Sequence, residues 1–93
     1  MKPHLYKSVW DALEDSADQA ANMRLRSELM IALRGQIEVW DTTQAKAAKR
    51  LRITQPRLND LLRGQIDKFS LDALVALAEQ AGLNVRLKVH AAA

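Results

Sequence analysis

The chain contains no cysteine, which excludes disulfide frameworks, thiolate metal sites and cysteine nucleophiles. Its two histidines, His4 and His90, lie at opposite ends of the sequence, and no glycine-rich phosphate loop is present. Neither histidine has the neighbours expected of a metal-ligand set, and Ser/His/Asp catalysis would have to use one of the two. We therefore expect a protein that is not an enzyme and that holds no metal or cofactor.

Glycine, proline and aromatic residues are also scarce, at three, two and four of 93 residues. This disfavours a turn-rich β-sandwich, whereas 15 alanines and 14 leucines favour helices. No apolar run approaches the roughly 18 residues of a membrane span. The first 15 residues turn acidic where a signal peptide needs an apolar core. With 48% apolar residues, the chain is expected to form one mainly α domain over residues 1–93 and to be cytoplasmic.

The first half of the chain predicts two helices. Ser8 and Ser16 each resemble an N-cap, for a short helix over residues 8–13 and for a longer helix over residues 17–39. Pro3 argues against a helix before residue 8. The longer segment has one apolar face and three arginines that we expect to be solvated; the apolar residues are Leu25, Leu29, Met30, Leu33, Ile37 and Trp40, and the arginines are Arg24, Arg26 and Arg34.

The second half predicts three shorter helices. Thr43 and Thr54 are expected to cap two of them, which together occupy residues 43–64. Phe69 and Leu74 have the spacing of a hydrophobic staple around a last helix over residues 71–81.

The segment after Gly82 has a different pattern, because residues 83–90 alternate strictly between apolar and polar side chains. This alternation is typical of a β-strand. A single strand cannot satisfy its backbone groups, and symmetric pairing with the same strand of a second chain is the simplest solution. Residues 3–7 and a strand of another protein are the alternative partners. The predicted dimerisation residues are Leu83, Val85, Leu87 and Val89.

Positive charge is concentrated in one stretch. The protein has a net charge of +3, whereas residues 46–63 carry six basic residues and the single acid Asp60. This stretch covers two short helices joined by a tight turn at Arg52-Ile53, which is typical of a helix-turn-helix. The second helix would expose polar side chains, among them the amide and guanidinium groups that pair with base edges; they are Gln55, Arg57, Asn59, Asp60 and Arg63. This combination predicts DNA binding.

Residues 43–82, TQAKAAKRLRITQPRLNDLLRGQIDKFSLDALVALAEQAG, resemble the helix-turn-helix of the Xre/Cro repressor superfamily. Together with the upstream run Leu25-Arg26-Ser27-Glu28-Leu29, they look closest to short HigA-like antitoxins of type II toxin–antitoxin modules. The resemblance covers about residues 8–89. It implies a five-helix, lambda-repressor-like domain with a short C-terminal strand. It also implies a dimeric repressor that binds a palindromic operator, neutralises a RelE-like toxin and represses its own operon.

The resemblance also implies roles for single residues. Gln44 would contact a phosphate, Gln55 and Pro56 would lie nearest the bases, and Arg57 would meet a phosphate or a guanine. Asn59 and Asp60 would also face the groove, and Arg63 would meet a phosphate. The full predicted DNA-binding set is Gln44, Thr54, Gln55, Pro56, Arg57, Asn59, Asp60 and Arg63.

The chain departs from the family at two positions. Arg52 occupies the turn position that is usually glycine, so a left-handed conformation there would be strained. Asp60 places a negative charge near DNA, where it would accept from a cytosine amino group or pair with Arg57.

Two other functions remain open at this point. One is a stand-alone or phage-type regulator of the same family with no toxin partner. The other is a helical protein-interaction module whose basic stretch meets an acidic protein. For the antitoxin, the candidate toxin contact is the acidic N-terminal segment within residues 1–18, which carries Asp11, Glu14, Asp15 and Asp18. Salt-sensitive retention of the protein's own upstream DNA would favour a repressor.

Overall fold

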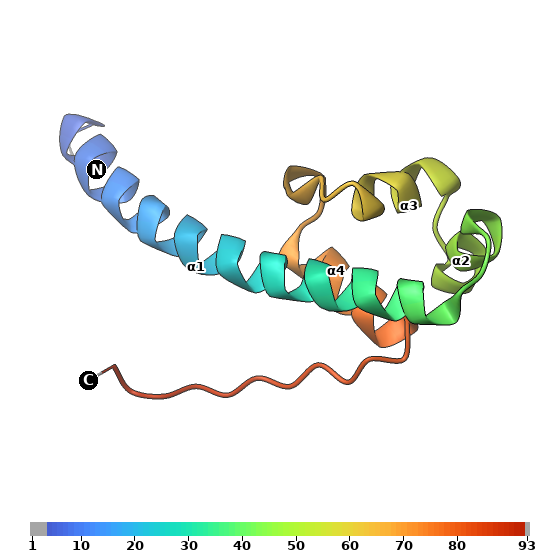
Figure 1. Ribbon diagram of the computed structural model, residues 1–93. Coiled ribbons are helices and arrows are strands. Elements are labelled where there is room, and N and C mark those ends of the chain that lie inside the picture. Colours follow the sequence, from blue (N-terminus) through green and yellow to red (C-terminus); the bar gives the residue numbers. More distant parts are fainter. Residues whose placement is uncertain (1–3, 93) are drawn as a thin grey trace.

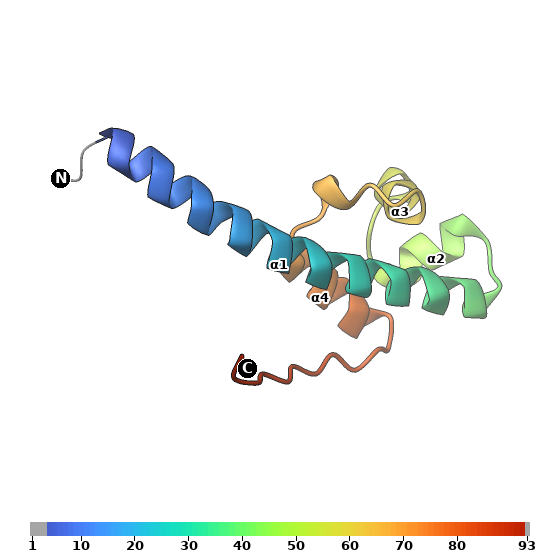
Figure 2. The same cartoon turned by 60° about the vertical axis from the view of Figure 1, so that its left-hand side comes forward.

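The computed structural model describes the backbone of residues 4–92 and the side chains of residues 19–92. Within that range it contains four α-helices and one short 3₁₀ helix: α1 (His4–Trp40), α2 (Gln44–Leu51), α3 (Gln55–Leu62), η1 (Ile66–Lys68) and α4 (Leu71–Gln80). The shorter helices pack around the C-terminal half of α1, and its N-terminal half extends beyond them (Figures 1 and 2). None of the described helices is long and apolar enough to cross a membrane.

The two helices predicted in the first half are one continuous helix, so the described chain has four α-helices rather than the expected five. Ser8 and Ser16 lie inside α1 and begin no helix. A capping residue starts a helix only where the preceding backbone is not helical, and no proline or glycine interrupts residues 4–34. The prediction that Pro3 would keep residues before 8 out of a helix was also wrong, because α1 begins directly after it.

The core lies between one face of α1 and the three shorter α-helices. Met30, Leu33 and Ile37 of α1 are buried, as the apolar spacing predicts, and Leu29 and Trp40 pack partly against them. Leu25 is instead 40% exposed, and it lines a groove beside α4. The remaining buried residues are Ala47, Ala48, Leu51, Leu58, Leu61, Phe69, Leu74, Leu77, Ala78 and Ala81.

The start of α4 is confirmed in detail. Ser70 is its N-cap, and its side-chain oxygen accepts a hydrogen bond from the backbone N–H of Ala73 at 3.1 Å. Phe69 and Leu74 are both buried, as expected of a hydrophobic staple. At the end of the helix, Gly82 has a φ of +87°, a left-handed conformation that glycine adopts without strain.

The segment after Gly82 does not form the predicted β-strand in one chain. Residues 83–92, which we call the C-terminal tail, run as an extended chain in the direction opposite to α1 (Figures 1 and 2). Two bonds hold the tail near its start: the backbone N–H of Leu83 donates to the Ala78 carbonyl at 2.9 Å, and that of Val85 donates to Oε2 of Glu79 at 3.0 Å. A strand requires a hydrogen-bonded neighbour, and no strand occurs in residues 4–92 to provide one.

Candidate nucleic-acid interface

Two threonine caps and one left-handed residue set the angle between α2 and α3. Thr43 Oγ1 accepts from the backbone N–H of Lys46, and Thr54 Oγ1 accepts from that of Arg57, each at 3.2 Å. Between the helices, Arg52 has φ 61° and ψ 40°. The prediction of a strained non-glycine residue at this turn is therefore confirmed, and the strain is compensated by the backbone bond from Ile53 N–H to the Ala48 carbonyl at 3.0 Å.

Small and apolar residues hold the two helices together. Ala47 and Ala48 of α2 are buried, as are Leu58 and Leu61 of α3. The small alanine side chains let the backbones approach closely, and the leucines anchor α3 over the core. One face of α3 is therefore fixed inward, and its orientation decides which polar side chains reach solvent.

The predicted DNA-binding residues divide into an exposed group and a partly buried group. The exposed ones are Gln44, Thr54, Gln55, Pro56 and Arg63. They lie at the first turn of α2, at the first turn of α3 and at the residue after α3. The second group is only partly exposed and consists of Arg57, Asn59 and Asp60.

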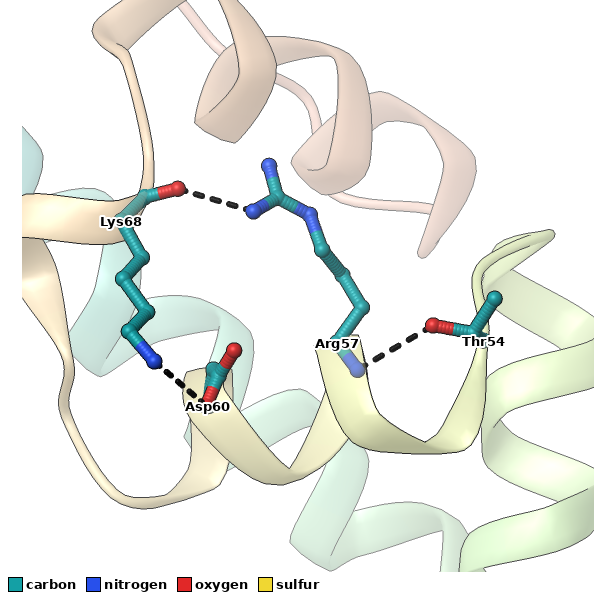
Figure 3. A network of polar contacts seen from close by, with 4 residues as sticks. All are labelled: Thr54, Arg57, Asp60 and Lys68. Atoms are coloured by element: carbon teal, nitrogen blue, oxygen red, sulfur yellow. Dashed lines mark hydrogen bonds and ion pairs between the residues drawn. The ribbon is translucent and has the colours of Figure 1, made fainter.

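Arg57 contacts other parts of the chain instead of extending into solvent. Its Nη1 donates to the Lys68 carbonyl at 2.8 Å, and its guanidinium carbon lies 4.1 Å from the centre of the Phe69 ring. Asp60 pairs with the Lys68 ammonium at 3.5 Å, so the expected pairing between Asp60 and Arg57 does not occur (Figure 3). Both side chains thus contact the segment that follows α3.

More positive charge surrounds the exposed group. Lys46, Lys49 and Arg50 of α2 are exposed, and so is Arg52 in the turn. The guanidinium of Arg50 lies over the Trp40 ring, 4.0 Å from its centre, and the amide of Gln80 donates to the Arg50 carbonyl at 3.2 Å. These contacts attach the C-terminal end of α2 to α1 and α4, so that its cationic face has a defined position.

Sequence reasoning missed several side chains that hold this arrangement together. Arg26 was expected to be solvated, but it is partly buried and its Nη1 donates to the carbonyls of Ile66 and Phe69 at 3.1 and 3.2 Å. Gln36 of α1 donates to the Ala81 carbonyl at 3.1 Å, which satisfies the end of α4. Because the partners are 40 to 45 residues apart in the chain, no local pattern in the sequence could have identified these bonds.

The four predicted dimerisation residues fall into two pairs. Leu83 and Val85 pack partly against the core, whereas Leu87 and Val89 are each 80% exposed. Beside the tail, a groove of about 670 Å³ lies between α1, α4 and the tail itself. Its lining includes Leu25, Leu29, Leu71, Val75, Val85 and Leu87.

Comparison with known proteins agrees with this geometry. Residues 12–90 match the model of a family described as "Helix-turn-helix domain". A solved structure titled "Putative XRE Family Transcriptional Regulator" superimposes with a TM-score of 0.74 at 27% sequence identity, over 80% of this chain and 83% of that one. Comparison with curated proteins finds no match.

Proposed function

The chain belongs to the helix-turn-helix domain family, and from this premise we propose that α3 reads operator DNA and that the protein is the antitoxin of a type II toxin–antitoxin pair. Its family and fold are those of an XRE-family, DNA-binding transcriptional regulator. In this proposal the protein is not an enzyme. It represses its own operon as a homodimer and neutralises a RelE-like toxin.

The first turn of α3 is the observation that carries operator reading. Gln55 is exposed at the start of a helix that is capped by Thr54 and anchored by the buried Leu58. A helix fits the major groove of B-DNA, where residues near its N-terminus meet base edges. The Gln55 amide can donate to N7 and accept from N6 of one adenine, a pairing that distinguishes base pairs.

The remaining exposed residues fit contacts that position the protein without reading sequence. Gln44 lies at the start of α2, and Arg63 lies immediately after α3. Side-chain amides and guanidinium groups commonly bind phosphates on either side of a recognition helix. The exposed cations of α2 add attraction to DNA that depends on salt concentration.

We expect Gln55→Ala to weaken operator binding by roughly 1–3 kcal/mol and to relax selectivity at one base pair, because the lost amide contacts belong to a base. The matched variant Arg63→Ala should weaken binding to all sequences alike and make the negative slope of log K against log salt shallower by about one. Fluorescence titration of operator, single-base variants and unrelated DNA at several salt concentrations measures both. Wild-type behaviour of both variants would show that α3 is not the reading helix.

The exposure of the tail supports a homodimer. The apolar residues of the alternating segment share one side, and they are Leu83, Val85, Leu87 and Val89. Only the first two are covered by their own chain. An antiparallel tail from a second copy, related by a two-fold axis, would pair the open backbone groups and cover the last two. Two recognition helices about 34 Å apart could then read successive major grooves of a palindrome.

The antitoxin part of the proposal is based on the resemblance to HigA-like proteins and on the length of α1. This helix of 37 residues precedes the helix-turn-helix and extends beyond the domain body (Figure 1). A protruding helix can bind a second protein while α3 binds DNA. The side chains of the candidate acidic contacts, Asp11, Glu14, Asp15 and Asp18, lie outside the described residues.

We expect co-expression with a short basic protein encoded by the adjacent gene to yield a stable complex. A chain that lacks residues 1–15 should capture less of that toxin, because it has lost most of the acidic segment and the charge attraction that it supplies. Pull-down through a C-terminal tag measures the capture, and DNA binding of the same shortened chain serves as the control. Undiminished capture would remove this segment from the interface, and the absence of any complex would favour a stand-alone or phage-type regulator.

The alternative of a helical protein-interaction module uses the same basic stretch for an acidic protein partner. A mobility shift with the protein's own upstream DNA at two salt concentrations separates the two functions. A repressor retains the specific DNA and releases it as salt rises, because phosphate contacts release counterions. An interaction module retains none at either concentration.

A further inference from the structure

Both the backbone and the side chain of Arg57 make hydrogen bonds to other residues. Its backbone N–H donates to Thr54 Oγ1, and its side chain reaches across to donate to the Lys68 carbonyl (Figure 3). The guanidinium also stacks over Phe69, whose ring is 1% exposed and belongs to the core. The direction of α3 at its first turn is thus coupled to the position of residues 66–69, which we call the η1 loop.

The η1 loop is in turn held from α1. Arg26 donates to the carbonyls of Ile66 and Phe69, at the two ends of the loop. A third attachment is the pair of Asp60 and Lys68 at 3.5 Å, which joins the loop to the second turn of α3. Two arginines from different helices therefore hold one loop, and α3 is connected to α1 through it.

We propose that Arg57 is a positioning residue for the recognition helix and that it does not bind DNA. This inference rests on operator reading by α3. The bond to the Lys68 carbonyl and the stacking on Phe69 turn the guanidinium toward the η1 loop, and a guanidinium that extended to a phosphate or a guanine would lose them. Its function here is to set the orientation at which α3 presents Gln55. Lysine cannot replace it, because an ammonium lacks the planar face and the forked donors that make both contacts at once.

Binding measurements on two Arg57 variants test the proposal. We expect Arg57→Met and Arg57→Lys each to weaken operator binding about 5- to 30-fold, because the hydrogen bond and the cation–π contact no longer hold α3 in its reading orientation. Binding to unrelated DNA and the salt slope should stay at the wild-type values. If Arg57→Met instead made the salt slope shallower by about 0.9, the value for one phosphate contact, and Arg57→Lys restored it, Arg57 would be a phosphate contact and the proposal would be overturned.

A matched pair on α1 tests the same loop from its other side. Arg26→Met removes both bonds to the η1 loop and should also reduce operator selectivity with an unchanged salt slope. Arg24→Met is the control, because Arg24 is exposed on the same helix and makes none of the hydrogen bonds found among the described side chains. Wild-type selectivity of Arg26→Met, with its fold intact by circular dichroism, would contradict the proposed coupling.

A measurement on the free protein separates this inference from operator reading itself. The side-chain protons of Arg57 should show upfield ring-current shifts from Phe69 in the NMR spectrum, and backbone amides of α3 should exchange faster in Arg57→Met than in wild type. Unshifted protons or unchanged exchange would overturn the positioning role whatever the DNA result. Shifted protons and faster exchange, together with wild-type operator binding by Gln55→Ala, would instead place the error in the reading helix.

Discussion

A chain that ends at Gly82 is expected to be a monomer in solution and to bind its operator roughly 100-fold more weakly than the full chain, because a monomer engages one half-site and loses the linked second contact. The tail has the alternating pattern of a strand, and two of its four predicted dimerisation residues are uncovered in a single chain. Light scattering measures the mass, and fluorescence titration with a palindromic operator measures the affinity.

The shortened chain should remain folded, because the buried core ends at Ala81 and the removed Leu83 and Val85 pack only partly against it.

A second, full-length variant makes the same test without truncation. The double substitution Leu87→Lys and Val89→Lys changes side chains that are 80% exposed, so it should leave helix content unchanged and abolish dimerisation. Arg86→Gln with Lys88→Gln is the control on the alternate positions. A truncated chain that stayed folded, dimeric and tight on its operator would exclude the tail as the interface.

Phe69→Ala should lower the free energy of unfolding by about 3–5 kcal/mol, the range for deleting a fully buried aromatic ring. The ring is 1% exposed, closes the core ahead of α4 and supports the Arg57 guanidinium. Domains of this size have only about 5–15 kcal/mol of stability, so the variant should lose a large part of it. Urea denaturation followed by circular dichroism measures the change.

Val39→Ala is the matched control for this stability measurement. Val39 lies on α1 and is 76% exposed, so its truncation should change the unfolding free energy by less than about 0.5 kcal/mol. A loss below about 1 kcal/mol for Phe69→Ala would mean that the ring is not part of the core.

The helix-turn-helix was predictable because its determinants are local. Thr43, Thr54 and Ser70 each accept a backbone hydrogen bond from the residue three positions ahead, so a cap can be identified within four letters of sequence. The left-handed Arg52 follows from the same local geometry. The resemblance to the Xre/Cro superfamily came from motifs along the chain, among them Thr54-Gln55-Pro56-Arg57 and Leu61-Leu62-Arg63-Gly64.

Local sequence patterns were misleading where the structure that forms depends on residues outside the pattern. The sequence around Ser16 has the form of a capping box, yet in the structure the helix continues through it. Whether such a serine begins a helix depends on the conformation of the residues before it, which its own sequence does not determine. The tail shows the converse case: its alternation is genuine, but a strand forms only with a neighbour, and one chain offers none among its described residues.

The sequence by itself determined the helical class, the two capped helices of the DNA-binding unit, the turn between them and the basic stretch that covers them. Each depends on residues within about four positions of one another, where backbone geometry leaves few alternatives. Only the tertiary structure decided that Arg57 faces Phe69 and Lys68, and that Arg26 holds the η1 loop. An arginine on a helix surface reaches solvent, DNA or a carbonyl equally well. Which of these it contacts depends on the folded chain, because the fold decides which backbone carbonyls lie within reach of the arginine.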